Sequence, residues 1–346
     1  MAMNTMRAAV LTAPKRFELR DVPVPTIGPE DVLVQVTRTG ICGTDVHIFN
    51  GHYAADKLPL IPGHEFCGTI AVRGANVRHL AVGTRVVVDI NIGCGTCFWC
   101  RRNEVLNCTE VTQVGIGRDG AFAEFVAVPA RLAIPVETGI PDEVLALTEP
   151  VACVVRAARK AAVGFGQSVV IFGAGPIGNL HVQMMRLVGV APIIVVDLSP
   201  DRCRMALDAG ADAAVSDPAD LKATVLRMTG GRGADLVIES VGNRKLYEQA
   251  FDLTRRGGHV AFFGITAPGE TVPVDILRTV LEEGGLKGSV AGMGQDMHDA
   301  LTLLSHGRFR TDDFTKASFS LDTIQEAFET LGNRPRDLKT QIAIAA

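Results

Sequence analysis

The hydrophobic positions of this 346-residue chain change their pattern near residue 141. Before that point, short runs of β-branched residues such as 32–36 and 85–89 lie between glycines and prolines, as strands do. Helical periodicity is scarce over 6–150. The pattern therefore predicts an irregular, β-rich first region.

Beyond residue 141, helical and strand patterns alternate. An Ala-, Leu- and Val-rich stretch predicts a helix over 142–163, with Asp142 as its N-cap and Gly164 as its stop. Strands are then predicted at 168–172, 193–196, 236–239 and 259–263, and helices at 179–188 and 200–209, with a last amphipathic helix at 321–331. Short apolar strands separated by helices are typical of a doubly wound parallel sheet, so we expect an α/β domain here.

Composition and charge narrow the class of protein. Apolar residues make up 47% of the chain and charged residues 21%, which is a globular balance. The net charge of −4 argues against a nucleic-acid partner, which calls for a basic face. No apolar run approaches the roughly 18 residues of a membrane span, and Pro14, Lys15 and Arg16 come too early for a signal peptide. We expect a soluble, cytoplasmic chain of two domains without a membrane partner.

A glycine-rich motif follows the predicted strand 168–172 and opens a predicted helix. It reads Gly173-Ala-Gly175-Pro176-Ile177-Gly178. In this context the first glycine allows the tight turn, the second lets the backbone approach a pyrophosphate, and the third permits close helix–strand packing. The anion then binds to the free N–H groups at the helix N-terminus. The pattern favours a dinucleotide site, and the alternative is a tight turn without a ligand.

An acidic residue at the end of the next strand supports the dinucleotide site. Asp197 lies 19 residues beyond Gly178, where a carboxylate accepts hydrogen bonds from the adenine ribose hydroxyls. A 2′-phosphate at about 4 Å from this carboxylate meets a repulsion of about 1 to 4 kcal/mol per unit charge. NAD should therefore be preferred over NADP by roughly tenfold to a thousandfold, unless a cation such as Arg202 intervenes.

Four of the eight cysteines lie within fifteen residues, in a segment that we expect to form a lobe over 91–110. Cys94, Cys97, Cys100 and Cys108 have the spacing C-x2-C-x2-C-x7-C. Four thiolates fill the tetrahedral shell of Zn²⁺ and leave no open position, so the pattern favours a structural zinc site. The rivals are an iron–sulfur cluster, a thioredoxin-like redox pair, and a nucleic-acid zinc ribbon, which would have more basic flanks.

Two further segments concentrate metal-ligating residue types. They read Gly40-Ile41-Cys42-Gly43-Thr44-Asp45-Val46-His47 and Gly63-His64-Glu65. A thiolate, an imidazole and a carboxylate can bind Zn²⁺ and leave a position free for substrate. Spacing does not show that Cys42 and His64 meet, so a buried cysteine and a hydrogen-bonded core histidine remain the alternative.

Together these motifs establish a family resemblance. Over nearly its whole length the chain resembles the zinc-dependent alcohol dehydrogenases of the medium-chain dehydrogenase/reductase superfamily. The matching segments, in family order, are 40–47, 63–65, 94–108, 173–178 and the acid at 197. The segment Thr148-Glu149-Pro150 is similar to the polyol or sorbitol dehydrogenase branch, in which a glutamate replaces a cysteine ligand; the run at 41–47 also resembles threonine dehydrogenase.

The resemblance implies a fold and a division into domains. A GroES-like, β-rich catalytic domain would comprise 1–152 and 290–346, with the structural zinc lobe at 91–110. A Rossmann domain, a doubly wound parallel sheet that binds NAD, would comprise 153–289. The family often forms homodimers or homotetramers, so we expect an oligomer.

The resemblance also implies two zinc ions per chain and a ligand set for the catalytic ion. Cys42, His64 and Glu65 would hold it, with Glu149 binding directly or through a water molecule. Asp45 would orient the His64 ring, as metal-bound imidazoles require. The four cysteines of the lobe would hold the structural ion.

The remaining residues of the motif would handle the substrate proton. Thr44 would accept the proton of the substrate hydroxyl and His47 would carry it to solvent. The zinc itself would dominate, because a metal ion can lower the pKa of bound water from 15.7 to about 7. One position departs from simple alcohol dehydrogenases: Gly43 stands where an arginine that binds the pyrophosphate is common, so the resemblance assigns no cation to the phosphates at this position.

The expected activity is hydride transfer from a secondary alcohol, a polyol or sugar alcohol, to NAD, giving a ketone. The alternative within the class is oxidation of an amino alcohol, as in L-threonine 3-dehydrogenase. A zinc-free quinone or enoyl reductase and a zinc-ribbon binding protein are the rivals outside it. Lys339 is a candidate ligand of a cofactor phosphate, whereas His181 and Cys153 are expected to pack without a chemical role.

Overall fold

The computed structural model describes residues 4–137, 139–333 and 336–344, and the chain divides into two compact units. The β-rich unit comprises Met1–Ala152, Met293–His306 and Thr311–Ala346, and the α/β unit comprises Cys153–Gly292 and Gly307–Arg310. The sequence placed 290–292 and 307–310 in the first domain. They belong with the second because Gly292 N–H donates to Cys153 Sγ at 3.3 Å and Arg310 N–H donates to Gln183 Oε1 at 2.6 Å.

Most strands of the β-rich unit form one sheet of seven. Its order is β16-β17-β3-β4-β5-β9, and β8 pairs with β3. β1 and β2 form a separate hairpin, and β6 pairs with β7. The strands are β1 (Thr5–Ala13), β2 (Arg16–Pro23), β3 (Asp31–Gly40), β4 (Glu65–Arg73), β5 (Arg85–Val88), β6 (Asn91–Ile92), β7 (Thr112–Gln113), β8 (Phe125–Pro129), β9 (Ala133–Pro135), β16 (Ala317–Ser320) and β17 (Thr340–Ala343). The helices are α1 (Gly43–Phe49), α2 (Phe98–Arg101), α3 (Asp142–Leu145), α10 (Gln295–Ser305) and α11 (Ile324–Thr330), with α4 (Thr148–Ala161) continuing into the other unit.

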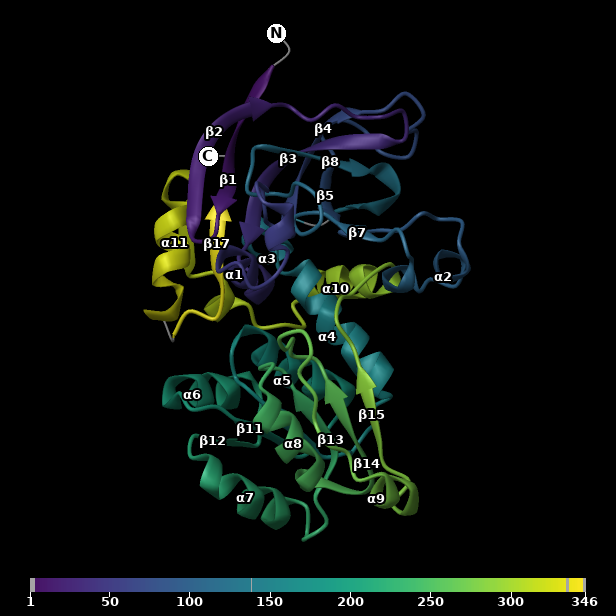
Figure 1. Cartoon of the computed structure of the whole chain (residues 1–346), viewed down its shortest axis with the longest axis vertical. Coiled ribbons are helices and arrows are strands. Elements are labelled where there is room, and N and C mark those ends of the chain that lie inside the picture. Colours follow the sequence, from purple (N-terminus) through teal and green to yellow (C-terminus); the bar gives the residue numbers. More distant parts are fainter. Residues whose placement is uncertain (1–3, 138, 334–335, 345–346) are drawn as a thin grey trace. The chain divides into compact units, whose positions relative to one another are not determined.

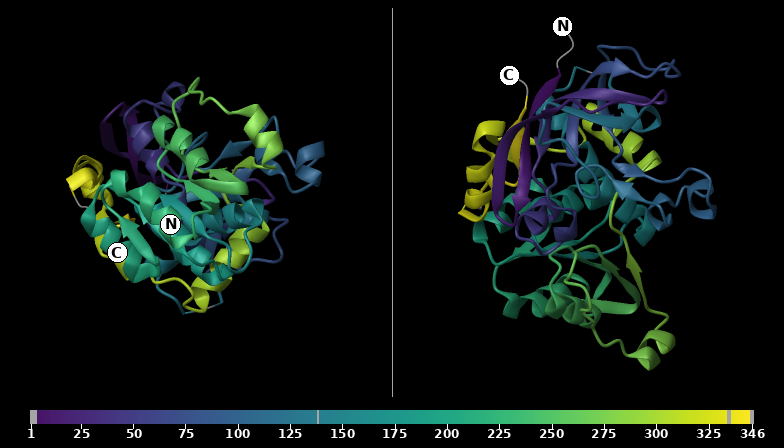
Figure 2. Two further views of the ribbon diagram at one scale, coloured as in Figure 1. Left: turned by 90° about the horizontal axis from the view of Figure 1, so that it is seen from below. Right: turned by 45° about the horizontal axis from the view of Figure 1, so that its top comes forward.

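The C-terminal segment completes this sheet. β17 pairs antiparallel with β3, so that Ile342 lies opposite Thr39, and Figures 1 and 2 show this yellow strand among the purple N-terminal strands. Phe17, Phe49 and Phe328 pack their rings within 5.6 Å of one another at the centre of the core. Phe49 is therefore a core residue.

The α/β unit is built on a parallel sheet of six strands in the order β12-β11-β10-β13-β14-β15. This order confirms the predicted doubly wound sheet, because the chain leaves β10 to build outward on one side and later returns to build outward on the other. The strands are β10 (Val169–Phe172), β11 (Ile193–Val196), β12 (Ala213–Val215), β13 (Ala234–Glu239), β14 (Thr254–Phe262) and β15 (Gly285–Gly288). The helices are α5 (Pro176–Val188), α6 (Pro200–Ala209), α7 (Leu221–Met228), α8 (Arg244–Leu253) and α9 (Ile276–Leu281).

Alternate residues of each central strand enter two different cores. Val169 and Ile171 of β10 pack with α5, α6 and the end of α4, whereas Val170 and Phe172 pack with α7 and α8. Successive strand side chains point to opposite faces, so a sheet with helices on both faces needs apolar residues at every position. This explains why these strands are continuous apolar runs.

The helix predicted over 142–163 is wrong as a single element, since the chain forms α3 and α4 with a break at 146–147. Pro150 explains the break. A proline lacks the N–H group and clashes in a helix interior, but it is tolerated in the first turn. A new helix beginning at Thr148 places Pro150 in that turn, and Thr148 Oγ1 donates to the Leu145 carbonyl oxygen at 2.7 Å across the junction.

Helix length can be compared with the thickness of a membrane. α4, with 14 residues, is the longest helix in the described part of the chain. A membrane-spanning helix needs about 20 apolar residues. Among the described residues, none of the helices is long and apolar enough to cross a bilayer.

His181 is a polar group enclosed in the core of the α/β unit. It lies on α5 with no exposed surface, and its ring meets Phe263 edge-on at 4.9 Å. Neither ring nitrogen has a hydrogen-bond partner within the described residues. Burial therefore lowers the pKa of His181 from 6.5 to about 3, and the imidazole is held neutral.

This histidine makes the unit acid-sensitive. Its folded pKa is depressed, so the unfolded chain binds the proton first, and the stability present above pH 6.5 is lost as the pH falls toward 3. We expect His181→Leu to remove about 2 kcal/mol of the loss in unfolding free energy between pH 6.5 and 5. Denaturant unfolding followed by circular dichroism measures it, with the exposed His79→Gln as the control. Parallel pH curves for His181→Leu and the wild type would contradict this account.

Candidate metal centres and cofactor site

The Asp45 carboxylate joins the two metal-ligating segments of the β-rich unit. Cys42, the N-cap of α1, donates its N–H to Asp45 Oδ2 at 2.8 Å. Gly63 N–H donates to Asp45 Oδ1 at 3.3 Å, and His64 Nδ1 lies 3.2 Å from the same oxygen. Asp45 is buried, so these contacts are shielded from water. One side chain therefore sets both the path of the backbone and the orientation of the imidazole.

Three donor atoms of different chemistry converge beside Asp45. The ligand atoms of Cys42, His64 and Glu65 all lie within 4.8 Å of one another. Register explains the meeting, because Glu65 opens β4 directly opposite Gly40, the last residue of β3, two residues before Cys42. Thiolate, imidazole and carboxylate suit Zn²⁺, and with His64 Nδ1 facing Asp45 the other ring nitrogen is available to a metal. The donor set fits a catalytic zinc ion.

His64 is a buried titratable group with two acidic neighbours. Burial alone would lower its pKa, but the charges of Asp45 and Cys42 and their hydrogen bonds outweigh burial and raise the pKa well above 6.5. The cluster of acidic groups therefore attracts positive charge. A divalent cation at this position would supply that charge and displace the proton.

The oxygen donor of the trio, Glu65, forms a buried ion pair. Lys339 Nζ donates to Glu65 Oε1 at 2.5 Å, and both side chains are almost completely buried. Gly40 makes room, because a Cβ on it would lie 2.3 Å from Glu65 Oε2 and 3.0 Å from Lys339 Cε. The suggestion that Lys339 binds a cofactor phosphate is wrong, because its ammonium group is buried in an ion pair with Glu65.

Glu149 lies near this group but outside the converging trio. It stands in the first turn of α4 and is 7% exposed. Burial lowers the pKa of Lys339, but the negative charges of Glu65, Cys42 and Glu149 outweigh burial and raise it. Glu149 therefore adds negative charge to the site, and its direct or water-mediated bond to zinc stays a prediction.

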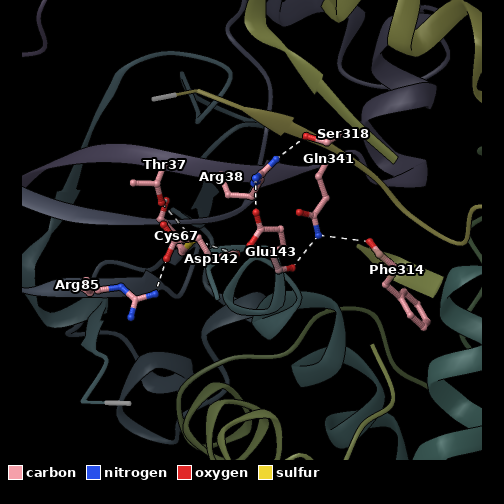
Figure 3. Close-up of polar contacts among 9 residues, drawn as sticks. All are labelled: Thr37, Arg38, Cys67, Arg85, Asp142, Glu143, Phe314, Ser318 and Gln341. Carbon is pink, nitrogen blue, oxygen red and sulfur yellow. Dashed lines mark hydrogen bonds and ion pairs between the residues drawn. The ribbon is translucent and has the colours of Figure 1, made fainter. Parts of the chain in front are cut away.

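The turn that precedes Glu149 is anchored by two arginines (Figure 3). Arg38 forms an ion pair with Glu143, and Arg85 pairs with Asp142 at 2.5 Å. Gln341 of β17 donates to the Glu143 carbonyl oxygen at 2.8 Å, which ties α3 to the strand that follows Lys339. The same sheet thus holds both the Glu65–Lys339 pair and the segment that leads to Glu149.

The two residues expected to move the proton lie on α1. Thr44 is half-buried and His47 is exposed, three residues further along the same helix. Residues three apart share a helix face, so a path from the site to solvent along α1 is sterically consistent. Their role in proton transfer remains a prediction.

The four lobe cysteines form a second converging group. The Sγ atoms of Cys94, Cys97, Cys100 and Cys108 lie within 4.8 Å of one another. Zinc–sulfur bonds of about 2.3 Å give S–S edges of about 3.8 Å in a tetrahedral site, which is compatible with this spacing of the sulfur atoms. N–H groups of Thr96 and Cys97 lower the pKa of the Cys94 thiol to about 6, which favours the thiolate. The site fits a structural zinc ion.

In the α/β unit, the glycine-rich motif forms the turn from β10 into α5. The helix begins at Pro176, three residues before the predicted start, with Gly175 as its N-cap. A Cβ on Gly178 would lie 1.9 Å from the Gly173 carbonyl oxygen, so the helix packs against the turn only because this residue is glycine. The N–H groups in the first turn of a helix have no acceptor within the helix, so those of α5 can bind an anion.

Asp197 and Arg202 lie beside this motif. Asp197 accepts the N–H of Ala174 on Oδ2 and the N–H of Ser199 on Oδ1, both at 2.8 Å. Arg202, in the first turn of α6, places its Nη1 3.8 Å from the Cβ position of Gly175. Its Nε is buried without a hydrogen-bond partner among the described residues. The structure therefore places a carboxylate beside Ala174 and a guanidinium group beside Gly175, both within the glycine-rich turn.

Comparison with known proteins agrees with this architecture. Residues 28–138 match the family model of the alcohol dehydrogenase GroES-like domain, and residues 176–306 match that of zinc-binding dehydrogenases. An L-threonine 3-dehydrogenase from Rhizobium rhizogenes is 32% identical over 336 residues, covering 95% of this chain and 96% of the relative. An L-threonine 3-dehydrogenase from Anaeromyxobacter sp. is 34% identical over 322 residues, covering 90% of each.

Solved structures give the same result. A zinc-binding dehydrogenase from Sinorhizobium meliloti, bound to NADP, has a TM-score of 0.90 at 32% identity, over 98% of this chain and 99% of that one. The 2R,3R-butanediol dehydrogenase of Bacillus subtilis has a TM-score of 0.87 at 27% identity, over 98% and 99%. The chain is thus an oxidoreductase of the zinc alcohol dehydrogenase type. It belongs to the zinc-dependent medium-chain dehydrogenase/reductase superfamily.

Sequence reasoning missed the partner of Glu65. Lys339 is separated from Glu65 by 274 residues, and no local sequence pattern predicts such a pair. A weak signal exists in the position of Lys339, a charged residue directly before β17, whose four residues are otherwise uncharged. Only the pairing of β17 with β3 gives that position its meaning.

Removal of Lys339 should destabilise the metal-free chain. Lys339→Met leaves the Glu65 carboxylate buried without its counter-ion, which costs about 3–5 kcal/mol of unfolding free energy. Added zinc should reduce this loss, because the cation compensates the same carboxylate. Chemical denaturation with and without chelator measures both values. Lys316→Met is the control, since the Lys316 ammonium group is exposed and its pair with Asp313 should contribute little; equal losses in the two variants would count against the buried pair.

Proposed function

We propose that this chain is a zinc-dependent, NAD-linked dehydrogenase of secondary alcohols that carry a second polar group beside the reacting carbon. The observation that carries the proposal is the convergence of Cys42, His64 and Glu65 within 4.8 Å, oriented by Asp45. The glycine motif of the α/β unit supports the dinucleotide, and the family supports the hydride chemistry.

Two zinc ions per chain would be held by two different donor sets. Cys42, His64 and Glu65, with Glu149 nearby, would hold the catalytic ion, and Cys94, Cys97, Cys100 and Cys108 the structural one. When bound, the catalytic ion would lower the pKa of a coordinated hydroxyl, and the dinucleotide would supply the acceptor of the hydride. Lys339 limits the negative charge at the site by neutralising Glu65.

The protein's own contribution to the chemistry is orientation and proton transfer. Asp45 fixes the His64 ring through Nδ1, so the imidazole is presented in one orientation. Thr44 Oγ1 would accept the proton that leaves the substrate hydroxyl, and His47 would release it to solvent from the exposed face of α1. The products are a ketone, a reduced dinucleotide and one proton.

The preference for NAD rests on Asp197. Its carboxylate accepts two backbone N–H groups and keeps lone pairs for ribose hydroxyls, while it repels a 2′-phosphate. The NADP in the Sinorhizobium meliloti structure shows that the scaffold tolerates the phosphate in a relative. In this chain Arg202 would contact the pyrophosphate beside Gly175, and so supply the cation that Gly43 does not.

Two substrate classes share the proposed chemistry. A polyol or sugar alcohol carries a neighbouring hydroxyl, and this class is suggested by Glu149 in the Thr-Glu-Pro segment. An amino alcohol such as L-threonine carries a neighbouring amine, and relatives at 32% to 34% identity bear the name L-threonine 3-dehydrogenase. Both classes are oxidised at a secondary carbinol carbon.

A substrate screen tests the proposed activity. The zinc-loaded protein is incubated with polyols, sugar alcohols, vicinal diols, L-threonine and simple alcohols, with NAD or NADP, and the absorbance at 340 nm is followed. We expect turnover with a polyol or with L-threonine, and a kcat/KM for NAD at least about tenfold above that for NADP. Failure of every alcohol to reduce either cofactor would refute the proposal.

Metal analysis of single variants tests the ligand assignment. We expect two zinc ions in the wild type and one in Cys42→Ser, which should lose turnover and keep its affinity for the dinucleotide, because Cys42 lies outside the α/β unit. Cys97→Ser should lose the other ion. Activity that survives in a metal-depleted sample, or a wild type with a single zinc, would contradict the assignment.

An oligomer is also proposed, and the surface of the α/β unit supports it. α9 exposes four aliphatic side chains, Ile276, Leu277, Val280 and Leu281, each between 68% and 73% exposed. β15, an edge strand of the parallel sheet, is exposed along its whole length. An apolar patch beside an open strand edge is typical of an interface, so a second copy could pair there in a homodimer or homotetramer. The molar mass in solution, measured by light scattering, checks this.

A further inference from the structure

Glu239, the last residue of β13, is a charged side chain with no exposed surface. Its carboxylate accepts three successive backbone N–H groups: Val241 and Gly242 at 3.0 Å and Asn243 at 3.4 Å. These groups immediately precede α8, of which Asn243 is the N-cap. Backbone N–H groups at such a turn form an anion-binding concavity, and here the protein's own carboxylate fills it.

The same residue holds a second turn. The Glu239 carbonyl oxygen accepts the N–H groups of Phe263 at 3.0 Å and Gly264 at 2.9 Å, directly after β14. A Cβ on Gly264 would lie 2.5 Å from Glu239 Oε2, so the turn closes onto the carboxylate. Tyr247 Oη donates to the Gly264 carbonyl oxygen from the other side. Glu239 therefore connects the turns at 240–243 and 263–265.

These turns border the glycine-rich motif. β13 is the neighbour of β10 at the point where the direction of chain growth across the sheet reverses, and ligands of such sheets bind at the carboxyl ends of those strands. A Cβ on Gly173 would lie 2.8 Å from Val241 Cγ2, and a Cβ on Gly242 would lie 2.3 Å from the Ile265 carbonyl oxygen. Val241 and Ile265 are 52% and 49% exposed, although both are aliphatic. Each belongs to one of the two turns that Glu239 connects, and Val241 lies against Gly173 of the motif; we call this pair of side chains the apolar shelf.

We propose that Glu239 is a positioning residue for the dinucleotide: it holds the 240–243 and 263–265 turns so that the shelf of Val241 and Ile265 is preformed against a heteroaromatic ring of the cofactor. This inference rests on the proposed function, which supplies the dinucleotide. A preformed shelf should bind the cofactor more tightly, because the loops that carry it lose less conformational entropy on binding. Glu239 itself does not touch the reacting atoms.

The same strand offers a matched control at its other end. Asp235 accepts Ser168 N–H at 2.8 Å and Ser168 Oγ–H at 2.7 Å, and it pairs with Arg255. It is thus a carboxylate on β13 that accepts hydrogen bonds, but it lies near the amino end of the strand, away from the glycine motif. Loss of either carboxylate should destabilise the α/β unit, whereas only loss of the Glu239 carboxylate should weaken cofactor binding.

The experiment compares Glu239→Gln with Asp235→Asn in the full-length, zinc-loaded protein. In Glu239→Gln an amide NH₂ group replaces one carboxylate oxygen beside the Gly242 N–H, so the 240–243 turn loses the charge and one of its acceptors, while the main-chain carbonyl oxygen of residue 239 still accepts the N–H groups of Phe263 and Gly264. The Kd of NADH, measured by titration calorimetry, should rise at least about tenfold in Glu239→Gln and stay within about twofold of the wild type in Asp235→Asn. Unfolding free energies are measured alongside. Glu239→Asp, which keeps the charge, should restore part of the affinity and replaces Glu239→Gln if the latter does not fold.

The outcomes distinguish a failure of the inference about Glu239 from a failure of the proposed function. If the wild type binds NADH and the Glu239 variants fold and bind it equally well, Glu239 has a structural role alone and this inference is overturned. If Asp235→Asn weakens binding as much as Glu239→Gln, the effect is one of general stability and the inference also fails. If the wild type itself does not bind NADH, the proposed function fails and this inference falls with it.

Discussion

The buried carboxylate of Asp45 connects the two chain segments that carry the candidate zinc ligands. It accepts N–H groups from Cys42 and Gly63 and faces Nδ1 of His64. Hydrogen bonds to a charged group contribute about 1.5–3 kcal/mol each, and burial of Asp45 keeps them from competing with water. Without this connection, the distance and orientation between the thiolate at the start of α1 and the imidazole before β4 would not be fixed. Tetrahedral coordination of a metal ion requires that they are.

Buried negative charge is stabilised in this chain by two different means. Glu65 is neutralised by the ammonium group of Lys339, whereas Asp45 and Glu239 accept backbone N–H groups at turns. The difference follows from local geometry. Turns that lead into helices offer several N–H groups at once, while Glu65 lies within a sheet whose N–H groups are already paired, so it needs a side-chain cation.

Prediction from sequence succeeded where the signal is local. The α/β unit was predicted with nearly all its central strands, because each is an apolar run, and α6 was predicted with its observed bounds. The helix over 142–163 was wrong because its apolar pattern continues through Pro150, whereas the missing N–H group of proline forces a new start. The start of β14 at Thr254 also lies before the predicted residue 259, since residues 254–258 carry no apolar pattern and pair with β13 through a bulge.

The sequence by itself determined which metal-ligating residue types this protein carries, the glycine-rich turn between β10 and α5, and the order of its elements, because hydrophobic period and motif spacing act over a few residues. Only the tertiary structure decided which donors meet. Cys42, His64 and Glu65 converge because β3 and β4 pair with Gly40 opposite Glu65, and Lys339 reaches Glu65 because β17 pairs with β3. Such contacts depend on sheet register and on the exclusion of water around a charge, and neither is encoded in the spacing of residues along the chain.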